Sequence, residues 1–256
     1  MKKRIYYLAI ILFFSNGIVF SQTTINEVVY KKRTLIDLSK VKTDNDPTKE
    51  AMVKAIPIAM GKKAYKLVFN DTESLFTEIL SLNDEGLTNT FANVSAKFSG
   101  GTEGKFYINM KQDTLLHQKS FRTDLLLIKS KVSDLDWQLD FKTSKKVGKY
   151  TCFKATTSKK ILMSSGKTVD QPITAWFCPE LPYPFGPTEF AGLPGLILEL
   201  EYYDKTVVYA DQINLNKKVD KKQKPIKPLK KGIKVTNQEY IDFMKKGGRQ
   251  YTRPKK

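Results

Sequence analysis

Alternation of apolar and polar residues with a period of two recurs along the chain, and it limits the fold more than any other feature. In the segment 136–142, Trp137, Leu139 and Phe141 alternate with polar residues. Successive side chains of a strand point to opposite faces, so this spacing predicts an antiparallel strand with one solvated face. Six further segments are also expected to be strands: Ala64–Asn70, Gly104–Lys111, Lys149–Thr157, Ile173–Cys178, Leu196–Tyr203 and Thr206–Leu215. Seven strands joined mostly by turn-length loops predict a meander.

Two helices are expected to interrupt the strands. The first covers about Thr48–Ala55, where Asp46 is suited to cap its start. The second covers about Asn237–Lys246, where Thr236 and Glu239 form a capping box. A meander with one apolar face needs a second layer to cover that face. The predicted fold is therefore mainly β (α+β): a curved antiparallel meander sheet or half-barrel with one or two covering helices.

The first 21 residues have the pattern of a secretory signal peptide. Basic residues at positions 2–4 precede the apolar run Ile5–Phe14, which is too short to span a membrane comfortably. The small residue Ser21 marks the expected cleavage point. Cleavage after Ser21 would leave a protein in the periplasm or outside the cell. Because no later stretch approaches a membrane-spanning length, we expect the mature chain not to span the membrane.

Charge divides the remaining chain into three parts. Residues 22–216 form a β-rich envelope domain of nearly balanced charge, whereas the residues from Lys217 onward include fifteen basic and three acidic ones. Residues 217–235 are predicted to be a basic Lys/Pro-rich linker, and residues 236–256 a C-terminal helix and basic tail. The linker is either a solvated flexible segment or a contact with an anionic surface such as lipid head groups. Nucleic acid is not an expected partner, since the basic residues do not lie on a folded face among aromatic residues.

The residue types exclude several kinds of chemistry. The chain holds one histidine, His117, and two cysteines, so it cannot supply the two or more imidazoles or four thiolates of the common zinc centres. It has no Gly-x-Ser-x-Gly motif, phosphate-binding loop or dinucleotide-binding fingerprint. The acidic pairs Asp84/Glu85 and Asp134/Asp136 are interpreted as solvated turn residues rather than glycosidase carboxylates. We therefore expect no enzymatic activity, no catalytic residue, no metal site and no cofactor.

The two cysteines are expected to face each other across a hairpin. If 149–157 pairs with 173–178 around a loop centred near residue 165, residues at equal distances from that centre lie opposite each other. Cys152 and Cys178 meet this condition. Export would permit a disulfide between them. Two buried reduced thiols are the alternative, and the sequence leaves both open.

The segment 175–198 holds five prolines and three glycines, so it forms neither a helix nor a sheet ladder. It is expected to be a rigid, turn-rich connection with two interpretations: a plug over the core, or a preformed surface that binds an apolar or amphipathic ligand. The residues assigned to binding are Trp176, Phe177, Tyr183, Phe185, Phe190 and Leu193. The residues assigned to structural turns are Gly186, Pro187, Gly192, Pro194 and Gly195.

The residues Gly192–Ile197 read Gly-Leu-Pro-Gly-Leu-Ile, and they follow a strand around Trp137, the segment Val147–Thr156 and the tripeptide Ala175-Trp-Phe. Over about Tyr65–Leu215 the chain resembles the GLPGLI family of exported proteins from Bacteroidetes bacteria. The resemblance implies an exported envelope protein. That family has no established biochemical function and supplies no catalytic residues.

Two functions follow from these expectations. In the preferred one, the protein binds or carries a lipid, another apolar or amphipathic ligand, or a partner segment, held against residues 176–193 and the concave face of the sheet. In the alternative, it is an accessory or structural component of an outer-membrane assembly and acts on an outer-membrane protein partner through its basic tail. A sizeable apolar cavity would favour the first, and a sealed core would favour the second.

Overall fold

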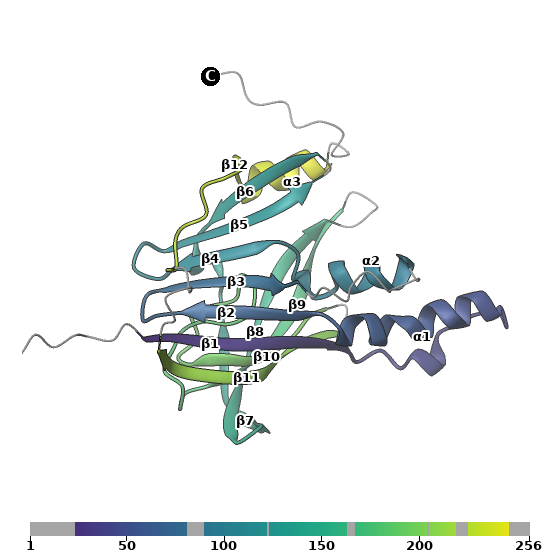
Figure 1. Ribbon diagram of the computed structural model, residues 1–256, viewed down its shortest axis with the longest axis horizontal. Helices are drawn as coiled ribbons and strands as arrows, with labels where there is room; N and C mark the ends of the chain where they lie inside the picture. Colours follow the sequence, from purple (N-terminus) through teal and green to yellow (C-terminus); the bar gives the residue numbers. More distant parts are fainter. Residues whose placement is uncertain are drawn as a thin grey trace, which may run out of the picture.

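A single open sheet of twelve strands forms the body of the protein in the computed structural model (Figure 1). The structure describes residues 24–80, 90–121, 123–162, 167–203, 205–218 and 225–245. The expected signal peptide at 1–21 lies outside these residues. The sheet is mainly antiparallel, and the fold is mainly β, as the alternation predicts.

The order of strands across the sheet is β12-β6-β5-β4-β3-β2-β1-β11-β10-β9-β8-β7. In chain order the strands are β1 (Thr24–Thr34), β2 (Ala64–Phe69), β3 (Glu73–Ile79), β4 (Lys105–Asn109), β5 (Thr114–Phe121), β6 (Asp124–Ser130), β7 (Gln138–Val147), β8 (Tyr150–Leu162), β9 (Thr168–Cys178), β10 (Leu196–Glu201), β11 (Thr206–Lys218) and β12 (Ile233–Thr236). The pairing of β12 with β6 is parallel, and the other pairs are antiparallel. Figure 1 shows β8 and β9 crossing behind β1–β4 at a steep angle, so the sheet is strongly curved.

All seven strands expected from the alternation are present, as β2, β4, β7, β8, β9, β10 and β11. Strands β1, β3, β5, β6 and β12 were not predicted. The strand β12 changes the expected linker at 217–235. Lys217 and Lys218 end β11, and the strand Ile233–Thr236 pairs with β6. The basic segment therefore begins and ends inside the sheet.

Three α-helices accompany the sheet: α1 (Pro47–Gly61), α2 (Thr90–Phe98) and α3 (Asn237–Lys245). The Asp46 carboxylate accepts hydrogen bonds from the backbone N–H groups of Thr48 and Lys49, at 2.8 and 3.3 Å, and so caps α1 as expected. The capping box of α3 is also present, since Thr236 and Glu239 exchange side-chain to backbone hydrogen bonds. Both predicted helices are therefore confirmed, although α1 is longer than expected.

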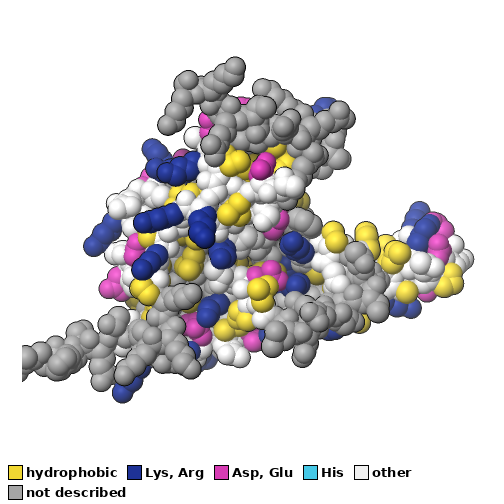
Figure 2. All heavy atoms as spheres, turned by 45° about the horizontal axis from the view of Figure 1, so that its top comes forward, with side chains coloured by type: hydrophobic (Ala, Val, Ile, Leu, Met, Phe, Trp, Pro, Cys, Tyr) yellow, Lys and Arg dark blue, Asp and Glu magenta, His cyan; other side chains and the backbone are white. Residues whose placement is uncertain are grey.

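Helices α1 and α2 form an arm beyond one end of the sheet and do not cover its apolar inner face (Figure 1). They pack on each other through a small cluster that is separate from the main core, formed by Ala59, Met60, Ala92 and Ala96. Figure 2 shows apolar side chains along this arm, while basic side chains are spread over the rest of that view. Only α3 fulfils the expected role of a covering helix, because it contacts β6, β12 and β8.

The Pro/Gly/aromatic loop between β9 and β10 covers most of the inner face instead. Phe69 on β2 packs against Tyr183 and Phe185 of the loop, with ring centroids 5.0 and 5.8 Å apart. Strands β1 and β11 lie between β2 and β10 in the sheet, so the loop must cross both of them to reach Phe69. The hydroxyl of Tyr30 on β1 donates a hydrogen bond to the Ile197 carbonyl at 2.7 Å. The loop therefore acts as a second layer of the fold.

The register of the β8–β9 hairpin is the one expected from the cysteine positions. Phe153 lies opposite Phe177, which puts Cys152 and Cys178 at the next pair of facing positions. Both thiols are free and fully buried. The structure thus places the two cysteines side by side, and the disulfide stays a prediction.

Candidate functional site

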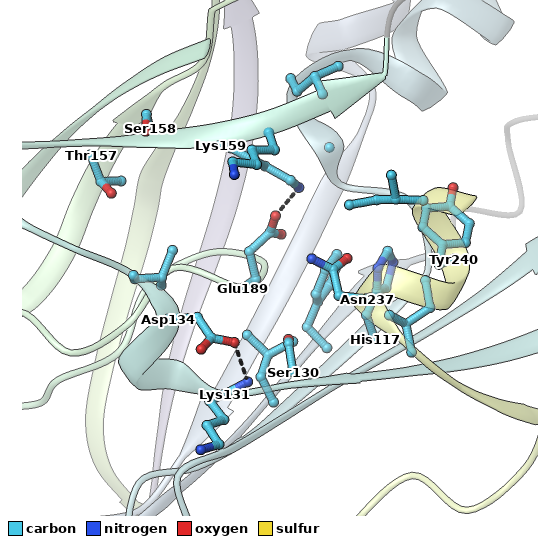
Figure 3. A pocket seen from close by; sticks show the side chains of 18 of the residues that line it. His117, Ser130, Lys131, Asp134, Thr157, Ser158, Lys159, Glu189, Asn237 and Tyr240 are labelled. Carbon is cyan, nitrogen blue, oxygen red and sulfur yellow. Dashed lines mark hydrogen bonds and ion pairs between the residues drawn. The ribbon is translucent and has the colours of Figure 1, made fainter. Parts of the chain in front are cut away.

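A cavity of about 630 Å³ lies inside the curve of the sheet, between strands β4–β6 on one side and β8 on the other (Figure 3). These strands are far apart in the order of the sheet, and its curvature brings them to face each other. Helix α3 closes the space because it contacts both β6 and β8. The cavity is therefore bounded by elements from both halves of the chain.

The size and lining of the cavity suit a small ligand. Cavities that bind small molecules typically have volumes of about 300–1,000 Å³, with mostly apolar walls and a few polar groups. The apolar part of the wall includes Phe106, Leu115, Ile128, Leu135, Ile241 and Met244. The polar groups come together around Glu189, which the loop between β9 and β10 carries into the cavity (Figure 3). The wall therefore combines an apolar surface with this polar centre, and further charged residues line it elsewhere: Lys131, Asp134, Asp136, Lys160 and Asp170.

Glu189 is the most enclosed acidic group of this centre, with 13% of its side chain exposed. Its Oε1 forms an ion pair with Lys159 of β8. Its Oε2 is buried and has no hydrogen-bond partner in the described part of the chain. Burial raises the pKa of this carboxyl, but the charge and hydrogen bond of Lys159, with a smaller effect from His117, outweigh burial and leave the pKa below its ordinary value. Glu189 is thus an ionised carboxylate with one unused acceptor.

His117 on β5 is the second polar group of the centre. Its ring stacks on Phe106, with centroids 4.0 Å apart, and its Nε2 lies 2.8 Å from the Glu103 carbonyl oxygen. A carbonyl only accepts, so this contact assigns the ring proton to Nε2. Burial lowers the pKa of His117 to about 4, although Glu189 opposes this effect. The imidazole is therefore neutral at pH 7, and its Nδ1 carries a lone pair.

The cations beside these groups already have partners. Lys119 Nζ lies 3.2 Å from a carboxylate oxygen of Glu103 and 5.4 Å from the ring centroid of Tyr240 on α3. Burial lowers the pKa of Lys119, but Tyr240 and Glu103 outweigh burial and raise the pKa above its ordinary value. Lys159 is paired with Glu189. The cavity thus holds two lysine–glutamate pairs and a neutral imidazole.

The six residues assigned to binding from the sequence do not line this cavity. Phe177, Phe185, Phe190 and Leu193 are at most 1% exposed and belong to the main core. Trp176 and Tyr183 are half-buried, and Lys145 Nζ lies 4.3 Å from the Trp176 ring centroid. This arrangement corresponds to the plug interpretation of the loop, and the loop contributes Glu189 to the cavity.

The turn glycines have the geometry that a tight plug requires. Gly195 has a φ of +155°, and a Cβ at this position would lie 2.3 Å from the Cys178 carbonyl oxygen. Gly192 has a φ of +91°, and a Cβ there would lie 3.7 Å from the Val132 side chain. At Gly195 the loop backbone therefore lies against the backbone of Cys178, the last residue of β9. At Gly192 the loop is packed less tightly against its neighbours.

Sequence reasoning missed the polar centre. The sequence predicts a surface or half-buried polar residue at His117, which is half-buried in the structure, and it does not single out Glu189 or Lys159. The one signal in the sequence was the presence of two acidic residues, Glu180 and Glu189, in a loop of mostly apolar residues and prolines. An acidic residue of this loop can be recognised as part of a cavity only when β5 and β8 are known to face each other. Alternation within single strands does not reveal that arrangement.

The described residues contain no group of three or more His, Cys, Asp or Glu side chains placed to hold a metal ion. None of the helices in the described ranges is both long enough and apolar enough to cross a membrane.

The fold and site define a class of protein: a mainly β chain whose curved sheet, loop between β9 and β10, and helix α3 line a cavity. A family model described as a protein of unknown function (Porph_ging) matches residues 163–199. The matched residues include all of β9, the loop that carries Glu189 and the start of β10. No curated protein matches the sequence significantly.

Among solved structures, the chain is similar to PNGF-II in its C2 and P21 space groups. The TM-scores are 0.48 and 0.47, with 14% sequence identity in both cases. The similarity covers 87% and 86% of this chain and 33% of the PNGF-II chain, so the present chain spans about a third of that protein.

Proposed function

We propose that this chain is an exported cell-envelope protein, related to the GLPGLI family, that binds an amphipathic ligand in the cavity beneath α3. The observation that carries the proposal is a cavity of about 630 Å³ whose wall combines apolar residues with the polar centre around Glu189. The apolar body of a ligand would contact residues such as Leu135 and Met244, and its polar end would lie beside Glu189. A lipid or another acylated molecule of the envelope has this chemistry.

Two features of the sequence support a role in the envelope. Residues 1–21 have the pattern of a signal peptide, which would direct the chain to the periplasm or the outside of the cell. The segment from Lys217 onward is rich in lysine, and basic segments are attracted to anionic lipid surfaces. The cavity favours a binding protein over the accessory role in an outer-membrane assembly, for which a sealed core was expected.

Filling the cavity provides the test. Thr157 of β8 lines it, and the neighbouring Thr156 points to the opposite face of the same strand. We expect Thr157→Trp to weaken the binding of eight-carbon amphiphiles at least tenfold and Thr156→Trp to leave the affinity unchanged. The measurement is titration calorimetry with octyl glucoside, octylammonium and octanoate, each below its micelle concentration.

Three results bear on the proposal. Tight binding of any of these amphiphiles to the wild type, lost on filling the cavity, would support it. Failure of all three to bind, or equal binding by both tryptophan variants, would contradict it. Native mass spectrometry of protein purified from its own compartment would add evidence if an acylated species remained bound.

A further inference from the structure

The polar centre of the cavity contains a buried acceptor that no described residue supplies with a donor. Each lysine beside it already forms an ion pair, Lys159 with Glu189 and Lys119 with Glu103. Glu189 Oε2 is buried, and no hydrogen bond reaches it from any residue that the structure describes. A buried polar atom without a hydrogen bond costs about 1–3 kcal/mol, and more for a charged group. The cavity is therefore incomplete until a donor reaches Glu189.

His117 adds a second acceptor to the same place. Its Nε2 donates to the Glu103 carbonyl, so Nδ1 of the neutral ring is left as an acceptor. Glu189 and His117 also affect each other's titration through their charges, which requires them to be close in space. Figure 3 shows both side chains in the same cavity, on either side of Asn237. The cavity thus holds these two acceptors on different elements.

The charges around these acceptors decide which kind of donor fits. A ligand ammonium beside Glu189 would also lie beside the Lys159 ammonium, which already neutralises that carboxylate. A ligand carboxylate would bring a third acceptor to Oε2 and Nδ1 and would supply no donor. A hydroxyl group donates a hydrogen bond without bringing a net charge. Neutral hydroxyls therefore satisfy the centre at the lowest electrostatic cost.

We infer that the polar end of the ligand is a neutral polyhydroxyl group, such as a saccharide unit, with hydroxyls that donate to Glu189 Oε2 and His117 Nδ1. This inference rests on the proposed function, since it names the ligand chemistry of the same cavity. The partly exposed aliphatic side chains of Leu135, Ile241 and Met244 hold the remainder of the ligand.

The test compares three ligands with the same eight-carbon chain and different head groups. At pH 7 we expect octyl glucoside to bind the wild-type protein at least tenfold more tightly than octylammonium or octanoate. We expect His117→Phe, which keeps an aromatic ring next to Phe106 but removes Nδ1, to weaken octyl glucoside binding about fivefold or more. Glu189→Gln is a second variant that removes the charged acceptor, and we expect it to weaken the same ligand while Thr156→Trp does not.

The outcomes separate the inference from the function on which it rests. If none of the three ligands binds the wild type, both are wrong. If octylammonium or octanoate binds as tightly as octyl glucoside, the function stands and the head-group inference is overturned. Unchanged octyl glucoside affinity in folded His117→Phe and Glu189→Gln proteins would also overturn it, with folding checked by circular dichroism.

Discussion

His117 links the site to the pH dependence of stability. Its pKa is about 4 in the folded protein, against an ordinary value of 6.5, because burial disfavours the charged imidazole. Between these values the unfolded chain binds a proton that the folded protein does not. The contribution of neutral His117 to the free energy of unfolding is therefore fully present above pH 6.5 and is lost as the pH falls towards 4. A shift of this size corresponds to about 3 kcal/mol.

We predict that His117→Gln makes the protein less sensitive to acid. Glutamine does not titrate, and its amide can still donate to the Glu103 carbonyl, so the variant lacks the imidazole proton uptake on unfolding. The free energy of unfolding in urea, measured at pH 7 and pH 4.5, should fall by about 2 kcal/mol less in His117→Gln than in the wild type. An identical loss in both proteins would show that His117 is not buried in the neutral form.

The paired cysteines give a second prediction at this scale. Burial raises the pKa of Cys152 to about 12 and also raises the pKa of Cys178, so both are protonated thiols at neutral pH. We expect the folded, reduced protein to react with iodoacetamide at least 100-fold more slowly than the unfolded protein. Mass spectrometry after unfolding without reductant checks the predicted disulfide: two added groups indicate free thiols, and none indicates a bond. Rapid labelling of the folded protein would contradict the observed burial.

At the scale of elements, alternation missed two strands that are covered on both faces along part of their length. In β1, Ile25–Val28 are all buried, and the Lys32 ammonium on the same strand donates to the Thr102 hydroxyl at 2.9 Å. In β6, Leu126, Leu127 and Ile128 are buried in succession. A strand that is covered on both faces does not alternate, so its sequence resembles a buried helix or loop.

The loop between β9 and β10 allows a test of its role as a layer of the fold. We predict that Gly195→Ala lowers the free energy of unfolding by more than about 2 kcal/mol, because the added Cβ would overlap the Cys178 backbone in addition to the torsional strain. Gly192→Ala is a matched control in the same loop. It meets no backbone within 3.7 Å, so only the torsional cost of about 1 kcal/mol is expected. Equal effects of both variants in urea unfolding would contradict the close approach at Gly195.

At the scale of the whole molecule, the candidate site could not be predicted, because no local segment contains it. Its polar centre consists of His117 of β5, Glu189 of the loop between β9 and β10, and Lys159 of β8. Helix α3, from the C-terminal region, contributes another part of the wall. These elements meet only because β1 pairs with β11 and connects the two halves of a curved sheet. The sequence predicted the class of fold, but not the curvature that creates the cavity.

We predict that ending the chain after Lys218 lowers the melting temperature and abolishes octyl glucoside binding. The truncation removes β12 and α3, and with them Val235, so it uncovers Leu126 and Ile128 and takes away one wall of the cavity. Circular dichroism should still show a mainly β protein, since eleven strands of the sheet remain. Unchanged melting temperature and affinity would show that this region is a separate appendage.

The two outer strands of the sheet affect whether copies of this protein associate edge to edge. An unpaired strand edge exposes backbone N–H and C=O groups that can recruit another chain into a continuous sheet. At one end β12 is only four residues long. At the other end β7 has a register shift between Asp140 and Ser144 and carries Lys142, Lys145 and Lys146. Short, irregular and lysine-rich edges oppose such growth. A twelve-stranded sheet can thus be kept at high concentration without strand-to-strand aggregation.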